Sequence, residues 1–468
     1  MLLLCLMKDI KSILAEASVG SAITAKGWVR TKRETKNAIF IELNDGSSFS
    51  GLQCVFDVHG LSKENAAALS RSNTGAALSV SGTLIDSPAS GQAVELKADG
   101  ITVIGECPAD SYPLQKKAHS LEFLREIAHL RPRTNTIGAA ARMRDEMAYA
   151  VHSFFHERGF RYIHTPIITA SDCEGAGEMF QVTSLDLDAL AKSGQPADYA
   201  KDFFGKKAYL SVSGQLNVEC YALALGKVYT FGPTFRAENS NTTRHLAEFW
   251  MIEPEFSFAE LPDNMALAEE FIKYLLGWAM ERCGEDLAFF DKRVQPGLIA
   301  MLEEVKNKKF AHMSYTDAVK ELEKKSGSFE FKPYWGCDLQ SEHERYLTES
   351  VIGGPVIVTD YPKELKAFYM RLNEDGKTVR AMDVLVPRIG EIIGGSEREY
   401  RYDVLLENIR AKGLDPEPYW WYLELRKFGS APHSGFGLGF ERLLRYVTGL
   451  ENIRDVIPFP RAVKQAEF

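Results

Sequence analysis

Five short stretches near the N-terminus alternate apolar and polar residues or run apolar, and they constrain the fold of this chain more than any other feature. Turn residues such as Asn44-Asp45-Gly46 separate them, as expected between β-strands. One helical stretch, Leu61–Ser72, lies between the third and the fourth. The pattern predicts a small β-barrel at this end of the chain. The five stretches span residues 22–30, 38–43, 50–56, 76–84 and 93–103.

Five strands with a helix after the third are the arrangement of an OB-fold barrel, and a generic small β-barrel is the alternative. Phe40 on the second strand can stack on an unpaired base, and Gln53 on the third can hydrogen-bond a base edge. We therefore expect residues 1–106 to form an OB-fold that binds RNA through Arg30, Phe40 and Gln53. A basic hairpin suits phosphate contact, although a solvated loop would look the same. It comprises Arg30, Lys32, Arg33 and Lys36.

A larger domain is predicted beyond a linker. Residues 107–130 form the expected linker or hinge, because Cys107–His119 carries prolines and lysines and has no apolar period. Apolar residues recur at helical spacing over Ile137–Arg158, so a long amphipathic helix is expected there, ended by Gly159. The remainder, 131–468, fits a mainly antiparallel sheet flanked by helices, which makes the whole chain α+β. Expected strands include 160–169, 354–362, 366–372 and 381–395.

Composition narrows the class of protein. A formal net charge of −9 over 468 residues argues against a protein that coats nucleic acid nonspecifically, although a local basic face still allows tRNA binding. The seven cysteines are scattered without a Cys-x-x-Cys pair, which favours the reduced cytoplasm over a disulfide framework. The apolar start, MLLLCLM, is too short to span a membrane. We expect residues 1–6 to be an extension before a start at Met7, a frayed terminus being the alternative.

Two separated blocks carry the residues that suggest chemistry. Phe235–Glu255 places two arginines, a histidine and four glutamates around an apolar Phe-Trp-Met-Ile run, and Gly435–Leu444 combines three glycines with Arg442. In this order they resemble motifs 2 and 3 of the class II aminoacyl-tRNA synthetases. A helix, Gly159 and a strand with Pro166 resemble motif 1, which in that family builds the dimer interface. The resemblance therefore implies a class II catalytic domain over 131–468 and a homodimer.

Activation of an amino acid by ATP depends on positioning and on neutralising phosphate charge. Arginine suits this because its planar, always charged fork binds two oxygens at once. The resemblance assigns Arg236 to the α-phosphate and the substrate carboxylate, Arg442 to the γ-phosphate, and Phe249 to adenine stacking. An isolated arginine would more often be a structural ion pair, and an isolated phenylalanine a core residue. Further candidates for contact with ATP or the tRNA acceptor end are Glu238, Arg244, His245 and Gly439.

Two acidic residues between these blocks are candidates for a metal site. Asp383 and Glu391 flank a turn and precede a Gly-Gly pair. Mg²⁺ prefers hard oxygen ligands, and it usually takes one or two carboxylates together with ATP phosphates. We therefore expect Mg²⁺ with ATP, with Glu391 the better ligand; a structural ion pair is the alternative for Asp383.

The amino-acid substrate is suggested by Ser211–Glu219, which resembles the Gln-Ser-Pro-Gln-Leu-x-Lys-Gln segment of aspartyl-tRNA synthetases. Val218 stands where that family has the lysine that contacts the substrate's carboxylate. Glu219 and Glu253 instead add negative charge, and two carboxylates ~4 Å apart repel by about 4 kcal/mol at an effective dielectric near 20. Three longer stretches closely resemble bacterial asparaginyl-tRNA synthetases, which implies L-asparagine and tRNA(Asn) as partners. They are Ser171–Phe180, Phe235–Glu255 and Gly435–Arg461.

The candidates for contact with the amino acid come from four segments. Which glutamate accepts the substrate amide stays open at this point. Arg398 matches the position that grips the side-chain oxygen in both subgroups of the family. Ser171–Phe180 would be a loop that closes over the amino acid. The candidates are Glu174, Ser213, Gln215, Glu219, Glu253 and Arg398.

Three other functions compete with an asparaginyl-tRNA synthetase. An aspartate-specific or non-discriminating enzyme is disfavoured by Val218. An asparagine synthetase on the same catalytic fold would not need an RNA-binding barrel with Phe40. A non-catalytic RNA-binding relative would not need to keep Arg236, Glu391 and Arg442.

Overall fold

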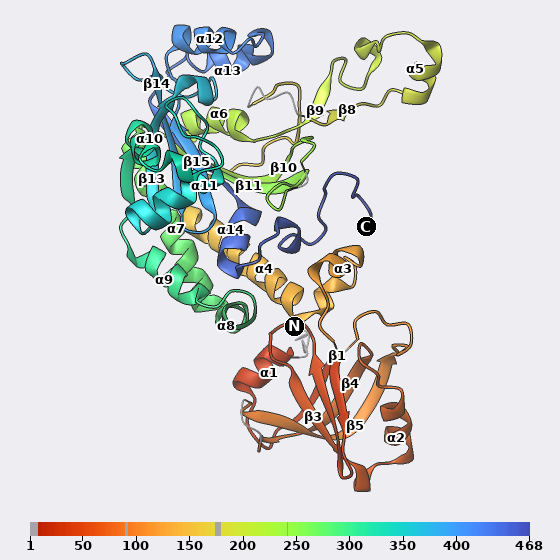
Figure 1. Cartoon of the computed structure of the whole chain (residues 1–468). Helices are drawn as coiled ribbons and strands as arrows, with labels where there is room; N and C mark the ends of the chain where they lie inside the picture. The colour runs from red at the N-terminus through yellow and green to blue at the C-terminus, as the bar shows by residue number, and fades with distance from the viewer. Residues whose placement is uncertain (1–7, 89–91, 116, 174–178, 241) are drawn as a thin grey trace. The chain divides into compact units, whose positions relative to one another are not determined.

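The computed structural model describes residues 8–88, 92–115, 117–173, 179–240 and 242–468 and divides into two compact units (Figure 1). The units are Met1–Arg142 and Met143–Phe468. The predicted extension at residues 1–6 and the loop residue Glu174 lie outside the described residues. The domain limits 1–106, 107–130 and 131–468 stay a prediction. The stretch expected to be a linker contains helix α3 (Leu121–Glu126).

The first unit contains a closed five-stranded barrel in the order β1-β2-β3-β5-β4, as the alternation predicted. Inward side chains alternate with outward ones along each strand, and they meet in one apolar core that includes Ile41, Phe56 and Leu78. Helix α2 follows the third strand, and α1 precedes the first. The elements are α1 (Ile10–Glu16), β1 (Ala22–Glu34), β2 (Ala38–Asn44), β3 (Leu52–Asp57), α2 (Lys63–Ser70), β4 (Ala77–Asp86) and β5 (Val94–Gly105).

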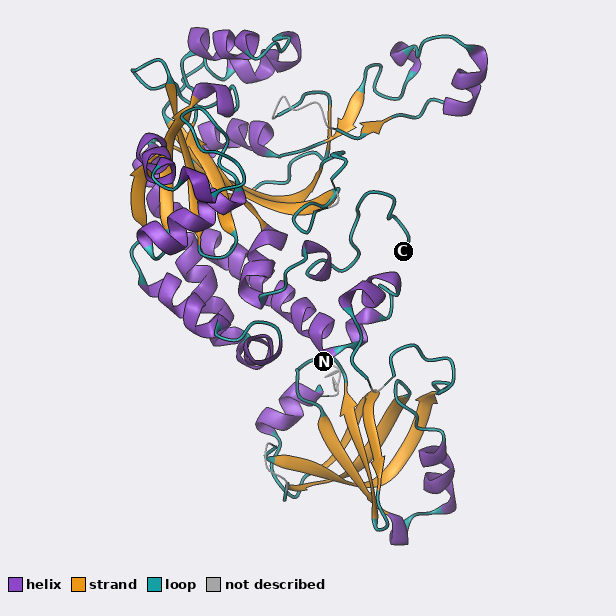
Figure 2. Cartoon of the chain, in the orientation of Figure 1, coloured by secondary structure: helices purple, strands orange, loops and turns teal. Residues whose placement is uncertain are grey.

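The second unit is built on an eight-stranded sheet in the order β12-β13-β14-β15-β16-β11-β10-β6. Figure 2 distinguishes the strands of the chain from its helices by colour. Neighbouring strands of the sheet run antiparallel except for the outer pairs β12–β13 and β6–β10, which are parallel. The mainly antiparallel sheet confirms the predicted α+β class. The strands are β6 (Arg161–Tyr162), β10 (Lys227–Phe235), β11 (Glu248–Ser257), β12 (Ala311–Ser314), β13 (Val356–Pro362), β14 (Thr378–Val386), β15 (Gly390–Glu397) and β16 (His433–Gly439).

Helices pack against this sheet through apolar stripes. Helix α4 (Asn135–Glu157) places Phe154 and Phe155 against Phe271 of α7, with ring centres 4.8 and 4.9 Å apart. Helix α7 packs on β14, β15 and β16, whereas α6 packs on β10 and β11. The other helices are α5 (Leu187–Ser193), α6 (Gln215–Leu225), α7 (Leu261–Arg282), α8 (Gly284–Arg293), α9 (Leu298–Asn307), α10 (Tyr315–Glu323), α11 (Ser341–Arg345), α12 (Tyr402–Ala411), α13 (Trp420–Glu424) and α14 (Phe440–Thr448).

Three predicted strands differ from the structure. The stretch 381–395, expected as one strand, contains the end of β14, a turn at residues 387–389 and most of β15. The stretch 160–169 forms only β6 and β7 (Ile168–Thr169), because Pro166 lies between them and cannot donate to a ladder. Strand β7 belongs to a small sheet with β8 (Gln181–Val182) and β9 (Ala208–Leu210). The prediction of a strand over 366–372 is wrong, since only isolated bridges occur there. Its apolar residues are buried for another reason: Phe368 and Tyr369 pack in a cluster with Tyr419 and Tyr422.

No helix in the described ranges is long and apolar enough to cross a membrane.

Candidate active site

One cavity of about 200 Å³ gathers the residues that the two sequence blocks suggested for ATP. It lies where β10, β11, β15 and β16 are neighbours in the sheet and where α14 begins. The loop between β10 and β11 forms another wall. Residues distant in sequence are thus brought together by the order of the strands. The cavity is lined by Arg236, Glu238, Arg244, His245, Phe249, Glu391, Gly439 and Arg442, among others.

The β10–β11 hairpin places Arg236 beside Phe249. Its strands pair Thr234 with Phe249, and the backbone N–H of Arg236 donates to the carbonyl of Ala247 at 3.0 Å. The guanidinium carbon of Arg236 lies 5.5 Å from the centre of the Phe249 ring. A flat aromatic face and a fixed cation therefore stand side by side, which suits a base and its attached phosphates.

A second arginine enters the cavity from the first turn of α14. Arg442 Nη1 donates to the backbone carbonyl of Glu391 at 3.0 Å and lies 3.3 Å from its carboxylate. Although burial opposes ionisation, Arg442 and Lys366 lower the pKa of Glu391. Both side chains remain more than a third exposed, so the pair is open to a ligand.

The loop between β10 and β11 holds the remaining candidates by local contacts. His245 Nδ1 lies 3.0 Å from the hydroxyl of Ser240, and His245 Nε2 lies 3.7 Å from the Glu238 carboxylate. Arg244 donates to the hydroxyl of Ser341 at the start of α11. These contacts place all three candidates on the cavity wall.

A cluster of carboxylates lies beside Glu391. Asp383 is held by Lys366 Nζ at 2.6 Å. Glu344, which the sequence did not suggest, accepts from the backbone N–H of Glu391 at 3.2 Å. Burial, followed by the charge of Glu391, raises the pKa of Glu344 to about 7. A Cβ at Gly390 would overlap the carboxylate of Glu344, so this packing needs glycine there.

The fit of this cluster to a divalent cation can be judged from its donors. Among the described residues, no group of three or more His, Cys, Asp or Glu is arranged to hold a metal by itself. Mg²⁺, however, takes few protein ligands and completes its shell with phosphate and water oxygens. Glu391 lies on the cavity wall, and the carboxylates of Asp383 and Glu344 lie close to it. This group fits a partial site of that kind.

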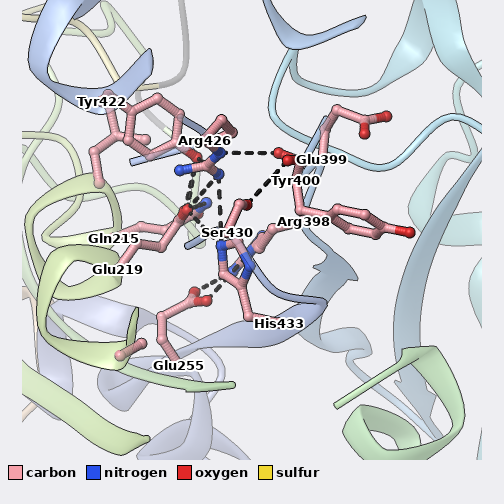
Figure 3. Close-up of polar contacts among 12 residues, drawn as sticks. Gln215, Glu219, Glu255, Arg398, Glu399, Tyr400, Tyr422, Arg426, Ser430 and His433 are labelled. Atoms are coloured by element: carbon pink, nitrogen blue, oxygen red, sulfur yellow. Dashed lines mark hydrogen bonds and ion pairs between the residues drawn. The ribbon is translucent and has the colours of Figure 1, made fainter. Parts of the chain in front are cut away.

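Glu219 lies at the centre of a buried polar network (Figure 3). Its carboxylate accepts from Arg426 Nη2 and the Tyr422 hydroxyl at 2.8 Å and from Gln215 Nε2 at 3.0 Å. It also lies 3.0 Å from His433 Nε2. Although burial opposes ionisation, Arg426 and His433 hold the pKa of Glu219 well below its usual range. The network therefore keeps a negative charge inside the protein.

Arg398 lies next to this network and pairs with Glu255 (Figure 3). Its Nε donates to one Glu255 oxygen at 3.1 Å, and Nη2 donates to the other, so the pair is bidentate. A Cβ at Gly435 would overlap the Glu255 carboxylate, so β16 needs glycine at this position. The charge of Arg398 also favours the ionised form of Glu219.

Not every candidate from the sequence faces this network. The Glu253 carboxylate accepts from the Ser213 hydroxyl and from the backbone N–H of Gly214, so it fixes the turn that starts α6. Val218 is fully buried in an apolar cluster with Ala222 and Val228. The position of the family lysine thus points into the core, while Glu219 beside it joins the polar network.

The cavity and the network share one face of the sheet. Phe249 and Met251 of β11 line the cavity, and Glu253 and Glu255 follow at the two-residue spacing that keeps side chains on one face. On β16, Gly439 and Gly437 line the cavity, and Gly435 and His433 continue toward the network. The arrangement can hold a nucleotide at one end and a small polar side chain at the other.

The sequence analysis missed several members of this site, which are Glu255, Glu344, Lys366, Tyr422, Arg426 and His433. Tyr422 and Arg426 lie four residues apart on and just after α13, which is the helical spacing that puts two side chains on one face. That spacing was the available signal, but Tyr422 also belongs to an aromatic run, Tyr419-Trp420-Trp421-Tyr422, which is typical of core packing.

The barrel places Phe40 and Gln53 on its outer face. Strands β2 and β3 pair Phe40 with Val55 and Glu42 with Gln53. The Arg33 guanidinium carbon lies 4.6 Å from the centre of the Phe40 ring. Gln53 Nε2 donates to Glu95 at 3.2 Å, and Arg30 is half-buried, donating to Asn44 at 3.4 Å.

The chain belongs to the class II tRNA synthetases of the D, K and N group, whose family model matches residues 120–463. A second family, the OB-fold nucleic acid binding domain, matches residues 23–104. The asparagine–tRNA ligase of Treponema denticola is 64% identical over 98% of this chain and 99% of its own. That of Thermosynechococcus vestitus is 57% identical over 99% of this chain and 100% of its own.

Solved structures agree with these relatives. The asparaginyl-tRNA synthetase of Pyrococcus horikoshii, complexed with asparaginyl-adenylate, has a TM-score of 0.86 and 31% identity. The match covers 98% of this chain and 99% of that one. The enzyme of Entamoeba histolytica in complex with the same adenylate has a TM-score of 0.82 and 29% identity, with 99% of each chain covered.

Proposed function

We propose that this chain is an asparagine–tRNA ligase, which forms asparaginyl-adenylate from L-asparagine and ATP and then charges tRNA(Asn). The observation that carries the choice of substrate is the ionised Glu219 beside Arg398, on the sheet face that leads from the ATP cavity. Close identity to asparagine–tRNA ligases over nearly the full chain supports the same activity.

Adenylate formation is assigned to the cavity residues as follows. The asparagine carboxylate attacks the α-phosphorus of ATP, the bond from that phosphorus to the oxygen bridging the α- and β-phosphates breaks, and pyrophosphate leaves. Arg236 would hold the α-phosphate and the attacking carboxylate, and Arg442 would hold the γ-phosphate. The two arginines would thus neutralise the negative charge that passes from the carboxylate to the leaving pyrophosphate. Phe249 would carry the adenine. Gly439 lets the backbone approach the nucleotide, and the loop residues Glu238, Arg244 and His245 close the cavity over it.

The family uses ATP with divalent cations, and we assign Mg²⁺ to Glu391 and Asp383. When bound, the cation neutralises phosphate charge. Glu391 lies on the cavity wall, whereas Asp383 is already neutralised by Lys366 at 2.6 Å. Glu391 is therefore the principal ligand, and Glu344 supports it through the backbone contact.

Glu391→Gln is expected to raise the Mg²⁺ concentration needed for half-maximal activation by about tenfold or more. Asp383→Asn should raise it less, because Lys366 already balances that carboxylate. Asparagine-dependent ATP–pyrophosphate exchange over a Mg²⁺ series measures both variants. Equal effects would contradict the ranking, and no effect of Glu391→Gln would remove it from the metal site.

Selection of asparagine is assigned to the buried charges. A carboxylate such as Glu219 accepts a hydrogen bond from the amide NH₂ of asparagine and repels the carboxylate of aspartate. Arg398 would donate to the side-chain oxygen. Gln215 donates to Glu219 and would border the space for the side chain of the amino acid. Ser213 and Glu253 would shape that space by fixing the turn before α6. Glu174 is assigned to the closing loop from the sequence alone.

The test of the function is ATP–pyrophosphate exchange with asparagine against aspartate, without tRNA. Exchange with asparagine alone is the expected result. Exchange with aspartate would favour the aspartate-specific or non-discriminating enzyme. Absence of exchange with either, in protein that is folded, would favour a non-catalytic RNA-binding relative.

The barrel is proposed to read the anticodon loop through Arg30, Phe40 and Gln53. Phe40→Ala is expected to raise the KM for tRNA by about tenfold, since stacking on one base contributes ~1–3 kcal/mol. Exchange without tRNA should keep its wild-type rate, because Phe40 belongs to the barrel unit and not to the ATP cavity. Trp28→Ala on strand β1 is a control for loss of an exposed barrel aromatic. Loss of exchange together with charging would mean that the barrel is not a separate reader.

A homodimer is proposed from the exposed apolar residues of the motif 1 region. Tyr149, Tyr162, Ile167 and Ile168 are each more than a third exposed and are contributed by α4 and the short strands after it. Exposed apolar side chains in the region that resembles motif 1 suit an interface between subunits. Sedimentation at the monomer mass at micromolar concentration would contradict it. The cytoplasm is the proposed location, supported by the free thiols of Cys54, Cys107, Cys220 and Cys337, and cell fractionation tests it.

A further inference from the structure

A second cavity adjoins the ATP cavity and has no part in the function described above. Its volume is about 570 Å³, and it opens between α9, the β14–β15 turn and the C-terminal half of α14. Arg244 lines both cavities and forms a wall between them. The two cavities therefore adjoin each other at this arginine of the loop between β10 and β11.

The second cavity is strongly cationic. Four arginines line it, and only Glu349 and Glu451 oppose them. None of the four forms an ion pair with a carboxylate in the described part of the chain. The Glu349 carboxylate is partly used by the backbone N–H of Arg388, which it accepts at 2.8 Å. The arginines are Arg244, Arg345, Arg388 and Arg445.

Two polar groups of this cavity are buried without a hydrogen-bond partner among the described residues. They are Nε of Arg445 and the hydroxyl of Tyr446, whose side chain is 2% exposed. Burial, and then the neighbouring charges of Arg244 and Arg442, lowers the pKa of Arg445 to about 10. Unsatisfied donors and crowded cations are costly in a folded protein, and an anion with several oxygens would relieve both.

The backbone is strained at Arg388, in the turn between β14 and β15 that lines this cavity. Arg388 has φ of +75°, a conformation that is uncommon for a residue with a side chain. Such strain persists only where the surrounding structure holds the residue in that conformation, and strained residues cluster at functional sites. Here it presents an exposed guanidinium at the mouth of a space whose inner wall holds Arg445.

We propose that this cavity is a second anion site that receives inorganic pyrophosphate from the ATP cavity, with Arg388 and Arg445 as its ligands. The proposal rests on the proposed function, which supplies pyrophosphate. Arg442 and Arg445 lie three residues apart on α14, so their side chains lie on one face of the helix, and the anion can pass from the first to the second. A pyrophosphate so held is removed from the adenylate that its return would cleave.

Pyrophosphate fits this cavity better than an RNA phosphate does. Its volume of about 570 Å³ and its four lining arginines suit a small free anion, which needs no continuous groove for a polymer backbone. Tyr446, the aromatic residue of the described lining, is buried up to its hydroxyl and offers no face on which a base could stack. Arginine forks bind phosphoryl oxygens in pairs, which suits a diphosphate.

Calorimetric titration tests the proposal with inorganic pyrophosphate as the probe. The full chain is first saturated with Mg²⁺ and an ATP analogue that has a methylene between the α- and β-phosphorus atoms, so that the ATP cavity is filled. Wild-type protein is expected to bind one further pyrophosphate. Arg445→Gln and Arg388→Gln should each weaken that binding by about tenfold. Arg410→Gln, which removes an exposed arginine from α12, is the control and should change nothing.

The outcomes separate this site from the function on which it rests. Absence of pyrophosphate binding to the loaded wild type, or binding to both cavity variants as tight as to the wild type, would overturn the site. Exchange with asparagine in the same preparations reports on the proposed function independently. A cavity variant with weaker tRNA charging but unchanged pyrophosphate binding would assign the arginines to RNA phosphates and overturn the proposal. Arg388 is exposed, so its variant keeps the test valid if Arg445→Gln fails to fold.

Discussion

Arg442→Ala is expected to reduce asparagine-dependent ATP–pyrophosphate exchange by roughly a thousandfold or more, with the fold intact. Arg442 is the only arginine of the first turn of α14 in the described structure, and it enters the cavity beside Glu391. Removing one preorganised donor from developing charge typically costs 10²–10³-fold, and a charged fork contributes two such bonds. Loss of its charge also leaves Glu391 without its nearest cation.

The stability of the Arg442→Ala variant should be nearly unchanged. The arginine is about a third exposed, and alanine favours a helix at least as well. Its midpoint of thermal unfolding and its oligomeric state are therefore the controls, with Arg410→Ala on α12 as a matched loss of one arginine. Near-normal exchange would remove Arg442 from the γ-phosphate. Loss of exchange with loss of folding would be resolved by Arg442→Lys, which keeps the charge and should recover part of the rate.

The architecture was predictable where its signal is local. The barrel follows from the two-residue alternation of its strands, because each strand carries its own inward face whatever its partner is. The residues of the ATP cavity were predictable because the blocks around Arg236 and Arg442 are contiguous in sequence. Strand order then brought them together, since β11 lies between β10 and β16 in the sheet.

The amino-acid network was only half predictable, because its signal is not local. Glu219 was a candidate, but its partners Tyr422, Arg426 and His433 lie more than 200 residues along the chain. Such pairings are set by the tertiary fold. Val218 was compared with the lysine that contacts the substrate in the related family, but its side chain does not face the site. The helical period places Val218 with Ala222 on the core face of α6, whereas Glu219 shares a face with Gln215. A helix predicted over this segment would have assigned Val218 to the core face and Glu219 to the opposite face.

Glu219→Gln is expected to lower discrimination between asparagine and aspartate by roughly a hundred- to a thousandfold, measured as the ratio of kcat/KM values in exchange. An ionised Glu219 disfavours the aspartate carboxylate by about 4 kcal/mol if the two lie ~4 Å apart at an effective dielectric near 20. Glutamine keeps the size and an acceptor oxygen but removes the repulsion. Asparagine should therefore lose activity modestly, while aspartate gains.

The structure adds a condition to this test. Glu219 balances the buried Arg426, so its neutralisation alone leaves a buried charge unpaired, which typically destabilises a protein by ~3–5 kcal/mol. The double variant Glu219→Gln with Arg426→Gln removes both charges and should unfold at higher temperature than the single variant. If the double variant also accepts aspartate, the lost discrimination belongs to the charge of Glu219 and not to loosened packing. If both variants fold and still reject aspartate, the selecting group lies elsewhere, and Glu255 with Arg398 becomes the pair to change next.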